Sequence, residues 1–257
     1  MIHPAAIIDP KAEIGEGVEI GPHSVIEKDV SIGEGTKIGP HVVIREGTHI
    51  GKRCQIFQFA SIGEAPQATF YRGEKTSLFI GDQNIIREFV TLHRGTIKGG
   101  GKTVIGNENF FMAYSHVAHD CQIGNQVVLA NGATLAGHIL IEDYAVIGGL
   151  SAIHQFCQVG THAFISGLTG ISLDIPPYML ASGSRAKLFG LNAVGLKRHG
   201  FSEETLKALK KAYRIIFRSG LTLEKAMKKV GEEEISKTPE VQHLLQFIQR
   251  SKRGISR

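Results

Sequence analysis

The sequence predicts a mainly β protein, in which a parallel β-helix of hexapeptide repeats precedes a C-terminal α-helical domain. Three observations support this fold class. An apolar residue stands at every sixth position over most of the chain, the residue four positions later is small or β-branched, and the apolar period becomes helical near the C-terminus. A helix has a period near 3.6 and an ordinary strand a period of 2, so a period of six indicates short strands joined by tight corners.

The six-residue period defines the predicted β-helix, residues 1–177. It runs from Ile2 to Ile62, resumes from Ile80 to Leu92, and continues from Ile105 to Ile171; none of these 26 positions is polar, and 20 of them are Ile. One large and one small inward side chain per hexad would fill a narrow triangular bore, with three hexads in each coil. We therefore expect coils of eighteen residues around a continuous apolar core.

Two excursions interrupt this pattern, at residues 63–79 and 93–104. The second contains the triplet Gly99-Gly100-Gly101, which permits unusual backbone angles. The triplet lacks the Lys-Ser/Thr pair of a phosphate-binding loop, so it does not by itself indicate a nucleotide site. Excursions leave one face of a solenoid and often carry binding function, so we expect a functional face there.

Residues 178–190 are expected to connect the β-helix to a helical domain, residues 191–257. Three helices are expected in that domain: Ser202 and Thr222 are expected to cap the first two, and Thr238-Pro239 opens the third. Apolar residues at helical spacing within them predict ordinary core contacts.

Charge is divided between the two domains. The helical domain has 15 Lys/Arg and 7 Asp/Glu, a net charge of +8, whereas the preceding residues carry a net charge of −3. A basic helical segment attracts polyanions, so one interpretation is that it binds an acidic protein or a nucleotide diphosphate. The alternative interpretation is a lysine-rich helix face that is only solvated. Nucleic acid is not an expected partner, because no helix-turn-helix, zinc-finger or aromatic RNA-binding signature is present.

The remaining composition favours a cytoplasmic enzyme or binding protein. No apolar run reaches membrane-spanning length, and the N-terminus lacks a secretory pattern. Cys54, Cys121 and Cys157 all fall on the small inward position of the hexad. We interpret them as buried core residues rather than as disulfides or nucleophiles.

Four histidines lie away from the inward positions: His116, His119, His138 and His154. Gly137, next to His138, stands eighteen residues after His119, and Gln155, next to His154, stands eighteen residues further on. Adjacent coils are separated by one strand spacing, about 4.8 Å. The histidines should therefore line one edge of the column, and we predict that this edge is functional.

At these residues the chain resembles the UDP-N-acetylglucosamine O-acyltransferase family, which begins lipid A biosynthesis in Gram-negative bacteria. The resemblance covers essentially the whole chain and rests on the hexads and six segments: His93–Thr96 with the glycine triplet, His116–Asp120, Leu135–His138, Ile153–Phe156, Asp174–Tyr178 and Gly195–Arg198. It implies a left-handed β-helix and a homotrimer with active sites between neighbouring subunits.

The resemblance also implies the chemistry. A sugar 3-hydroxyl would attack the thioester of a 3-hydroxyacyl chain on the phosphopantetheine of acyl carrier protein, without a further cofactor or a metal. His119 is similar to the family's general base, and an imidazole suits that task near neutral pH. Asp120 would orient it, which requires a corner because successive strand residues diverge. Gly137 resembles the backbone donor to the oxyanion.

Further positions match substrate contacts of the family. The acceptor sugar or thioester pocket is implied for Gln67, His116, His138, His154 and Gln155. Asn192 and Arg198 resemble contacts to the nucleotide and its diphosphate. Gly167 matches the position that sets acyl length, where the missing side chain suggests a long chain.

Departures from the family pattern leave alternatives open. Ala68 and Phe70 stand where relatives usually have an acidic and a basic residue in the first excursion. This less polar pocket suggests appreciable activity with a 3-amino-3-deoxy sugar nucleotide. A zinc enzyme of the carbonic-anhydrase type, with His116, His119 and His138 as ligands, is a second alternative, and a purely structural scaffold is a third.

Overall fold

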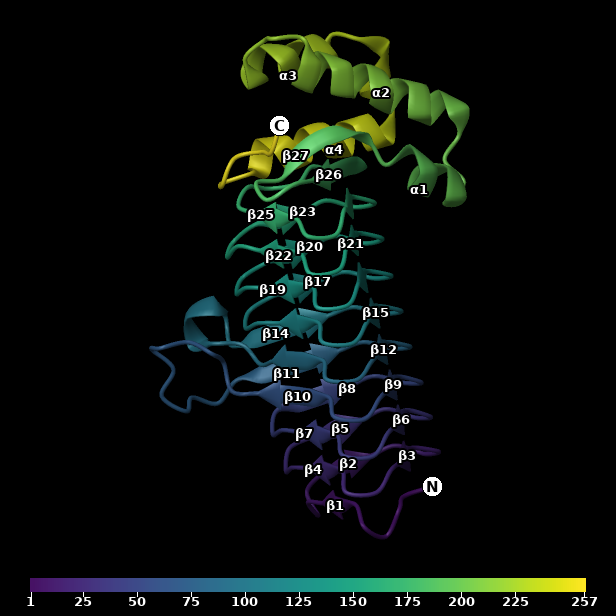
Figure 1. The fold of residues 1–257 in the computed structure, drawn as a ribbon, viewed down its shortest axis with the longest axis vertical. Helices are drawn as coiled ribbons and strands as arrows, with labels where there is room; N and C mark the ends of the chain where they lie inside the picture. The colour runs from purple at the N-terminus through teal and green to yellow at the C-terminus, as the bar shows by residue number, and fades with distance from the viewer.

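The computed structural model describes all 257 residues and shows a column of short strands with helices at its C-terminal end (Figure 1). Three sheets form the sides of the column. Outside the excursions, paired strands lie eighteen residues apart, as His116 with Thr134 and Val117 with Leu135. This spacing confirms the three-hexad coil.

The strands of the column belong to three sheets with parallel pairing. The first sheet contains β1 (Ile7–Ile8), β4 (Val25–Ile26), β7 (Val43–Ile44), β10 (Ser61–Glu64), β13 (Thr91–His93), β16 (His116–Val117), β19 (Thr134–Leu135), β22 (Ala152–Ile153) and β25 (Gly170–Ile171). The second contains β2 (Glu13–Ile14), β5 (Ser31–Ile32), β8 (Thr48–Ile50), β11 (Ser77–Ile80), β14 (Lys102–Ile105), β17 (Gln122–Ile123), β20 (Leu140–Ile141) and β23 (Gln158–Val159). The third contains β3 (Glu19–Ile20), β6 (Lys37–Ile38), β9 (Gln55–Ile56), β12 (Ile85–Ile86), β15 (Phe110–Phe111), β18 (Val128–Leu129), β21 (Val146–Ile147), β24 (Phe164–Ile165) and β26 (Met179–Ser182), to which β27 (Lys187–Leu191) adds antiparallel.

The six-residue period forms the core of the column. Its members are buried from Ile20 to Ile171, and the three cysteines of the small inward position are buried and unbonded. Burial raises the pKa of the Cys121 thiol to about 12 and that of Cys157 to about 11, so these thiols stay protonated. Only Ile2, Ile8 and Ile14 depart from the pattern, because no coil lies beneath the first one to cover them.

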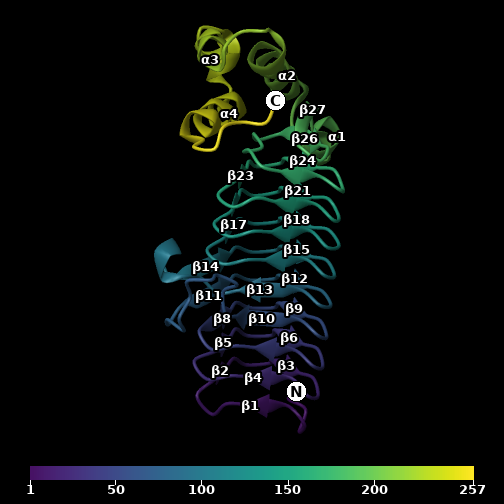
Figure 2. The same ribbon diagram turned by 60° about the vertical axis from the view of Figure 1, so that its left-hand side comes forward.

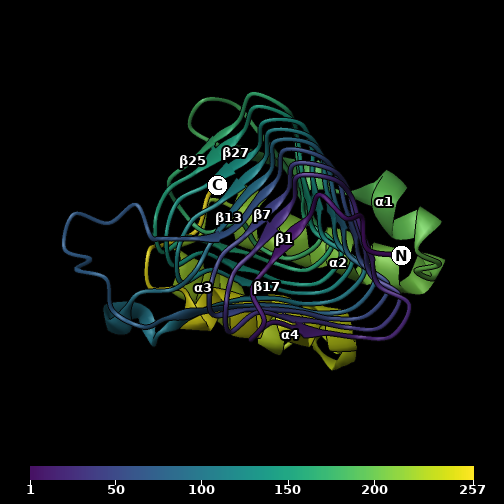
Figure 3. The ribbon, with the colours of Figure 1, turned by 90° about the horizontal axis from the view of Figure 1, so that it is seen from below.

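The column has three edges, which we call the first corner (between the first and second sheets), the second corner (between the second and third) and the third corner (between the third and first). Both excursions leave at the first corner and project to one side, away from the edge where α1 lies (Figure 3). They are shorter than predicted, because β10 continues to Glu64, β11 begins at Ser77, and β14 begins at Lys102. The second excursion holds a short 3-10 helix, η1 (Ile97–Gly99).

The C-terminal residues form α1 (Ala193–Arg198), α2 (Glu203–Arg218), α3 (Leu223–Gly231), η2 (Glu234–Lys237) and α4 (Pro239–Arg250). The helices α2, α3 and α4 gather beyond the last coils, whereas α1 lies beside them at one edge of the column (Figure 2). Both expected caps are present, since the hydroxyls of Ser202 and Thr222 each accept from the backbone N–H three residues later, and α4 begins at Pro239 as expected. The residues expected to be a plain connector form the β26–β27 hairpin instead, and α1 was not expected. No helix combines the length and apolar character needed to cross a bilayer.

Candidate active site

His119 and Asp120 form a buried pair at the first corner. The His119 Nδ1 and Asp120 Oδ2 atoms lie 2.7 Å apart, and the two residues are only 6% and 5% exposed. Asp120 has a φ of 62°, in the left-handed region. This bend brings together two neighbouring side chains that would point to opposite faces in a strand, so the corner required for the pairing is present.

The second excursion covers this pair. Thr96 donates its backbone N–H to Asp120 Oδ1 and its hydroxyl to Asp120 Oδ2, each at 2.7 Å. The Thr103 hydroxyl accepts from the Asp120 backbone N–H at 2.8 Å. Sequence reasoning placed His119 at an outward or corner position but missed its burial and the roles of both threonines; the signal was the His93–Thr96 segment with its glycine triplet.

Gly137 lies directly against the His119 ring, one coil away. A Cβ atom at this position would stand 2.6 Å from His119 Cε1, closer than any side chain can approach. The Gly137 backbone N–H donates to no acceptor in the chain. The corner therefore offers a free donor beside the imidazole, as stabilisation of an oxyanion requires.

Three further imidazoles surround the pair. His138 Nε2 lies 3.5 Å from Asp120 Oδ2, and its ring stacks on Phe156 with centroids 4.6 Å apart. His116 Nδ1 lies 2.7 Å from the Thr91 hydroxyl. His93, which sequence reasoning did not select, is 4% exposed, contacts the His116 ring edge-on, and has no partner for its Nδ1.

Burial keeps these neighbouring imidazoles neutral. It lowers the pKa of His93 to about 4 and lowers the pKa values of His116 and His138. For His138 the Asp120 carboxylate partly opposes the effect. Near neutral pH the rings of His93, His116 and His138 are thus uncharged and can accept hydrogen bonds.

Other predicted residues of the first corner are more exposed. His154 and Gln155 follow in the next coil, and Gln67 lies on the first excursion. The two excursions touch each other. Arg94 donates to the Tyr71 hydroxyl at 3.0 Å, and the Lys98 ammonium lies 4.2 Å from the centroid of the Phe70 ring.

Three predicted residues lie at the other corners. Gly167 is exposed at the third corner. Asn192 and Arg198 line a cavity of about 620 Å³ at the second corner, together with the rings of Tyr144 and His162. Asn192 also caps α1 by accepting from the Gly195 backbone N–H at 3.1 Å. A single chain therefore does not bring Gly167, Asn192 or Arg198 to His119.

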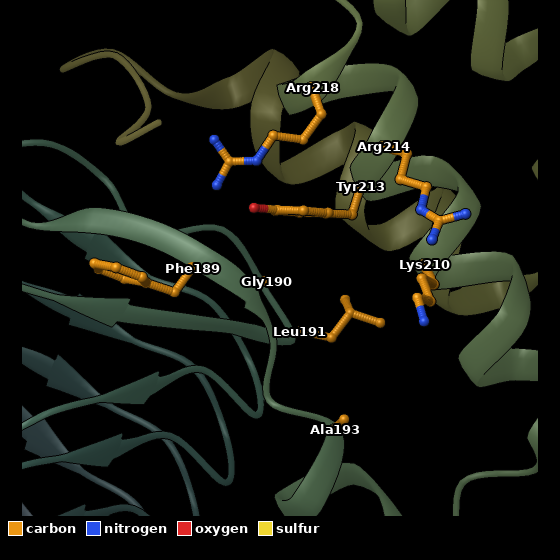
Figure 4. Close-up of a pocket in the computed structure, with 8 residues that line it drawn as sticks. All are labelled: Phe189, Gly190, Leu191, Ala193, Lys210, Tyr213, Arg214 and Arg218. Atoms are coloured by element: carbon orange, nitrogen blue, oxygen red, sulfur yellow. The ribbon is translucent and has the colours of Figure 1, made fainter.

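A second cavity, of about 670 Å³, lies between β27 and α2 (Figure 4). Its lining includes Lys210, Arg214 and Arg218 and no acidic residue. Arg218 donates to the Leu188 carbonyl at 2.7 Å, whereas Lys210 and Arg214 make no ion pair. Part of the basic charge predicted for the helical domain is thus concentrated on one face of α2.

The donor set at the first corner does not fit the zinc alternative. The ligating atoms that lie within 4.8 Å of one another belong to His119, Asp120 and His138, rather than to three histidines. Both Asp120 oxygens already accept hydrogen bonds, and His116 pairs with Thr91. These side chains are already hydrogen-bonded within the protein, so their ligand atoms are not free to coordinate a zinc ion.

Comparisons with known proteins agree with this geometry. The family model described as UDP-N-acetylglucosamine O-acyltransferase, domain 2, matches residues 174–256, and that of the bacterial transferase hexapeptide matches residues 29–64 and 102–137. The acyl-[acyl-carrier-protein]–UDP-N-acetylglucosamine O-acyltransferases of Janthinobacterium sp. (strain Marseille) and Thermodesulfovibrio yellowstonii are 55% and 56% identical to the chain, over 100% of it and 99% of theirs.

Solved structures extend the match to three dimensions. The UDP-N-acetylglucosamine O-acyltransferase of Moraxella catarrhalis superposes with a TM-score of 0.96 at 45% identity, over 100% of this chain and 99% of that one. The acyltransferase of Francisella novicida gives 0.97 at 41% identity, over 100% and 94%. The β-helix is accordingly left-handed, and relatives named for transfer to oxygen do not favour the amino-sugar or zinc alternatives. The chain belongs to the UDP-N-acetylglucosamine O-acyltransferase family.

Proposed function

We propose that this protein transfers a 3-hydroxyacyl chain from acyl carrier protein to the 3-hydroxyl of UDP-N-acetylglucosamine, the first step of lipid A biosynthesis. The observation that supports this most strongly is the buried His119–Asp120 pair beside the free N–H of Gly137. A base, an orienting carboxylate and an oxyanion donor are the groups that acyl transfer to an alcohol needs.

The proposed reaction starts with the acceptor hydroxyl, which is too weak an acid to ionise by itself. His119 Nε2 accepts its proton while the oxygen attacks the thioester carbonyl. Asp120 accepts from His119 Nδ1–H, which keeps Nε2 free to act as the base. The Gly137 N–H stabilises the oxyanion of the tetrahedral intermediate. Collapse forms the ester and expels the phosphopantetheine thiolate, which takes the proton from imidazolium; no cofactor enters these steps.

Substrate contacts follow from the positions around this pair. We assign the sugar and thioester pocket to His116, His138 and His154 with Gln67 and Gln155. His116 lies on β16 beside the first corner, and the other four lie at this corner or on its excursion. The neutral imidazoles of His116 and His138 can accept from sugar hydroxyls without competing for the transferred proton.

The complete site is proposed to form between subunits of a homotrimer. Asn192 and Arg198 at the second corner would hold the nucleotide, and Gly167 at the third corner would accommodate the end of the acyl chain. Since one chain keeps these residues at separate corners, a neighbouring copy must bring them to His119. Exposed apolar side chains at the third corner, among them Tyr114 and Leu150, support such a contact.

The acyl carrier protein is proposed to dock on the helical domain of this cytoplasmic enzyme. Lys210 and Arg214 face the cavity of Figure 4 without acidic partners. An acidic partner would supply the missing charges, and long-range attraction would speed its approach.

A transfer assay tests the function. Purified protein is incubated with long-chain 3-hydroxyacyl carrier protein and either UDP-N-acetylglucosamine or its 3-amino-3-deoxy analogue, and the product is identified by mass spectrometry. We expect an O-acyl product, with kcat/KM for the hydroxyl sugar at least about tenfold higher, equivalent to about 1.4 kcal/mol.

The same substitution at two histidines, one inside and one outside the proposed site, provides the control. His119→Asn should lower kcat by roughly 10²–10⁴-fold, the usual contribution of a general base. His49→Asn, on β8 outside the proposed site, should leave kcat unchanged. Absence of transfer by the wild-type protein, or N-acylation preferred over O-acylation, would contradict the proposed function.

A further inference from the structure

Thr96 contacts the site only through Asp120, and it does so with both of its donors. Its backbone N–H donates to Oδ1 and its hydroxyl to Oδ2 of the same carboxylate, and Thr96 is 1% exposed. With His119 Nδ1–H, three donors converge on a carboxylate whose side chain is inaccessible to water. Charge-assisted hydrogen bonds in such a site are stronger and more directional than those between neutral groups.

These contacts determine how the carboxylate is oriented. Two donors from one residue hold the two oxygens separately, so rotation of the Asp120 carboxylate would break both bonds at once. The plane of the carboxylate in turn sets the direction from which Oδ2 meets His119 Nδ1. The corner brings Asp120 beside His119, but the second excursion fixes its rotamer.

Gly99 completes this arrangement. Its backbone N–H donates to the Thr96 hydroxyl oxygen at 3.2 Å, which leaves the hydroxyl proton directed to Asp120 Oδ2. A Cβ atom on Gly99 would lie 2.0 Å from Asp120 Cγ. Only glycine lets the turn approach the carboxylate this closely. At Gly100, by contrast, a Cβ atom would have no other group within 4 Å.

The excursion is anchored independently of any substrate. Arg94, two residues before Thr96, donates to the Gly63 carbonyl at 2.9 Å and to the Tyr71 hydroxyl at 3.0 Å. Thr96 is therefore held in place before a ligand enters, as preorganisation of a catalytic group requires.

We propose that Thr96 is a positioning residue, which acts through Asp120 to hold His119 in the tautomer with its proton on Nδ1, and that Gly99 is required for its approach. This inference rests on the proposed function, because it assumes that His119 is the base. It gives the His93–Thr96 segment, and Gly99 among the three glycines that follow it, a role in the reaction.

The first test removes only the Thr96 hydroxyl. Thr96→Val should lower kcat roughly tenfold to a hundredfold, as expected for loss of a charge-assisted hydrogen bond, while both KM values stay within about twofold. Thr96→Ser restores the hydroxyl and should recover kcat to within about threefold. The His119 tautomer is determined by ¹⁵N NMR of histidine-labelled protein, and His119→Asn serves to assign the signal. The Thr96→Val protein should show a mixture of the two His119 tautomers, whereas the Thr96→Ser protein should show only the one with its proton on Nδ1.

The second test compares adjacent glycines. Gly99→Ala should lower kcat at least as much as Thr96→Val. Gly100 has a φ of 96°, in the left-handed region that Asn also adopts. The kcat of Gly100→Asn should therefore stay within about threefold of the wild-type value. An unchanged kcat and His119 spectrum in Thr96→Val would overturn the inference, as would failure of Thr96→Ser to recover them. An active His119→Asn enzyme would instead refute the base, so the two failures are distinguishable.

Discussion

Burial of His162 predicts that the folded protein loses stability as the pH falls below 6.5. The ring is 8% exposed and stacks on Tyr144 with centroids 4.5 Å apart. Burial, and then the charge of His199, lower its pKa from 6.5 to about 4, against a smaller opposing effect of Asp143. Between these pH values the unfolded chain binds a proton that the folded chain does not, so the free energy of unfolding decreases with falling pH.

The magnitude follows from the two pKa values. At pH 5.0 the difference in proton binding costs about 2 kcal/mol, whereas at pH 7.5 it costs less than about 0.1 kcal/mol. His162→Phe keeps the stacked ring but removes the titration. Its loss of stability between pH 7.5 and 5.0 should therefore be about 2 kcal/mol smaller than that of the wild type. His93, with a pKa of about 4, contributes in the same direction to both proteins.

Equilibrium urea unfolding at both pH values, at one protein concentration, measures this difference. His49→Phe is the matched control, because His49 also stacks on an aromatic ring, that of Phe79, but is only partly buried. An equal pH dependence of the wild-type and His162→Phe proteins would show that His162 is not held neutral by the fold.

Three further predictions concern the proposed site. Gly137→Ala should lower kcat by roughly 10²-fold in steady-state kinetics, because its Cβ would displace the His119 ring; an unchanged kcat would show that the two residues do not meet. Arg198→Ala should raise the KM for the nucleotide sugar about tenfold without changing that for the carrier protein, and the reverse pattern would contradict its assignment. Charge reversal in Lys210→Glu should raise the KM for the carrier protein, and added salt should raise the same KM for the wild-type enzyme. The control is Lys225→Glu, which reverses an exposed charge on α3. Equal increases in KM for Lys210→Glu and Lys225→Glu would argue against docking at α2.

Much of the fold could be predicted from the sequence, because each coil buries the same hexad positions whatever surrounds it. Ile26 and Ile147 are both buried, in widely separated coils, and the same six-residue period predicts the burial of each. The first coil shows the limit of this reasoning, since Ile2 follows the period but has nothing below it to pack against.

The parts that escaped prediction depend on contacts between distant segments. The β26–β27 hairpin forms because β26 extends the third sheet beside β24, which no local pattern reveals. The corner position of His119 was predictable from its phase. Its burial was not, because that depends on how the second excursion folds back onto Asp120 through Thr96.

Mixing two impaired variants tests most directly whether His119 works at a site shared between chains. His119→Ala and Arg198→Ala chains are unfolded together, refolded at equal concentration and assayed with UDP-N-acetylglucosamine below the KM of the Arg198→Ala enzyme. If neighbouring subunits supply the two residues, random assembly should restore about a quarter of the wild-type activity, because one interface in four receives both intact side chains. A mixture no more active than the average of the two separately refolded variants would contradict an intersubunit site with His119 as its base.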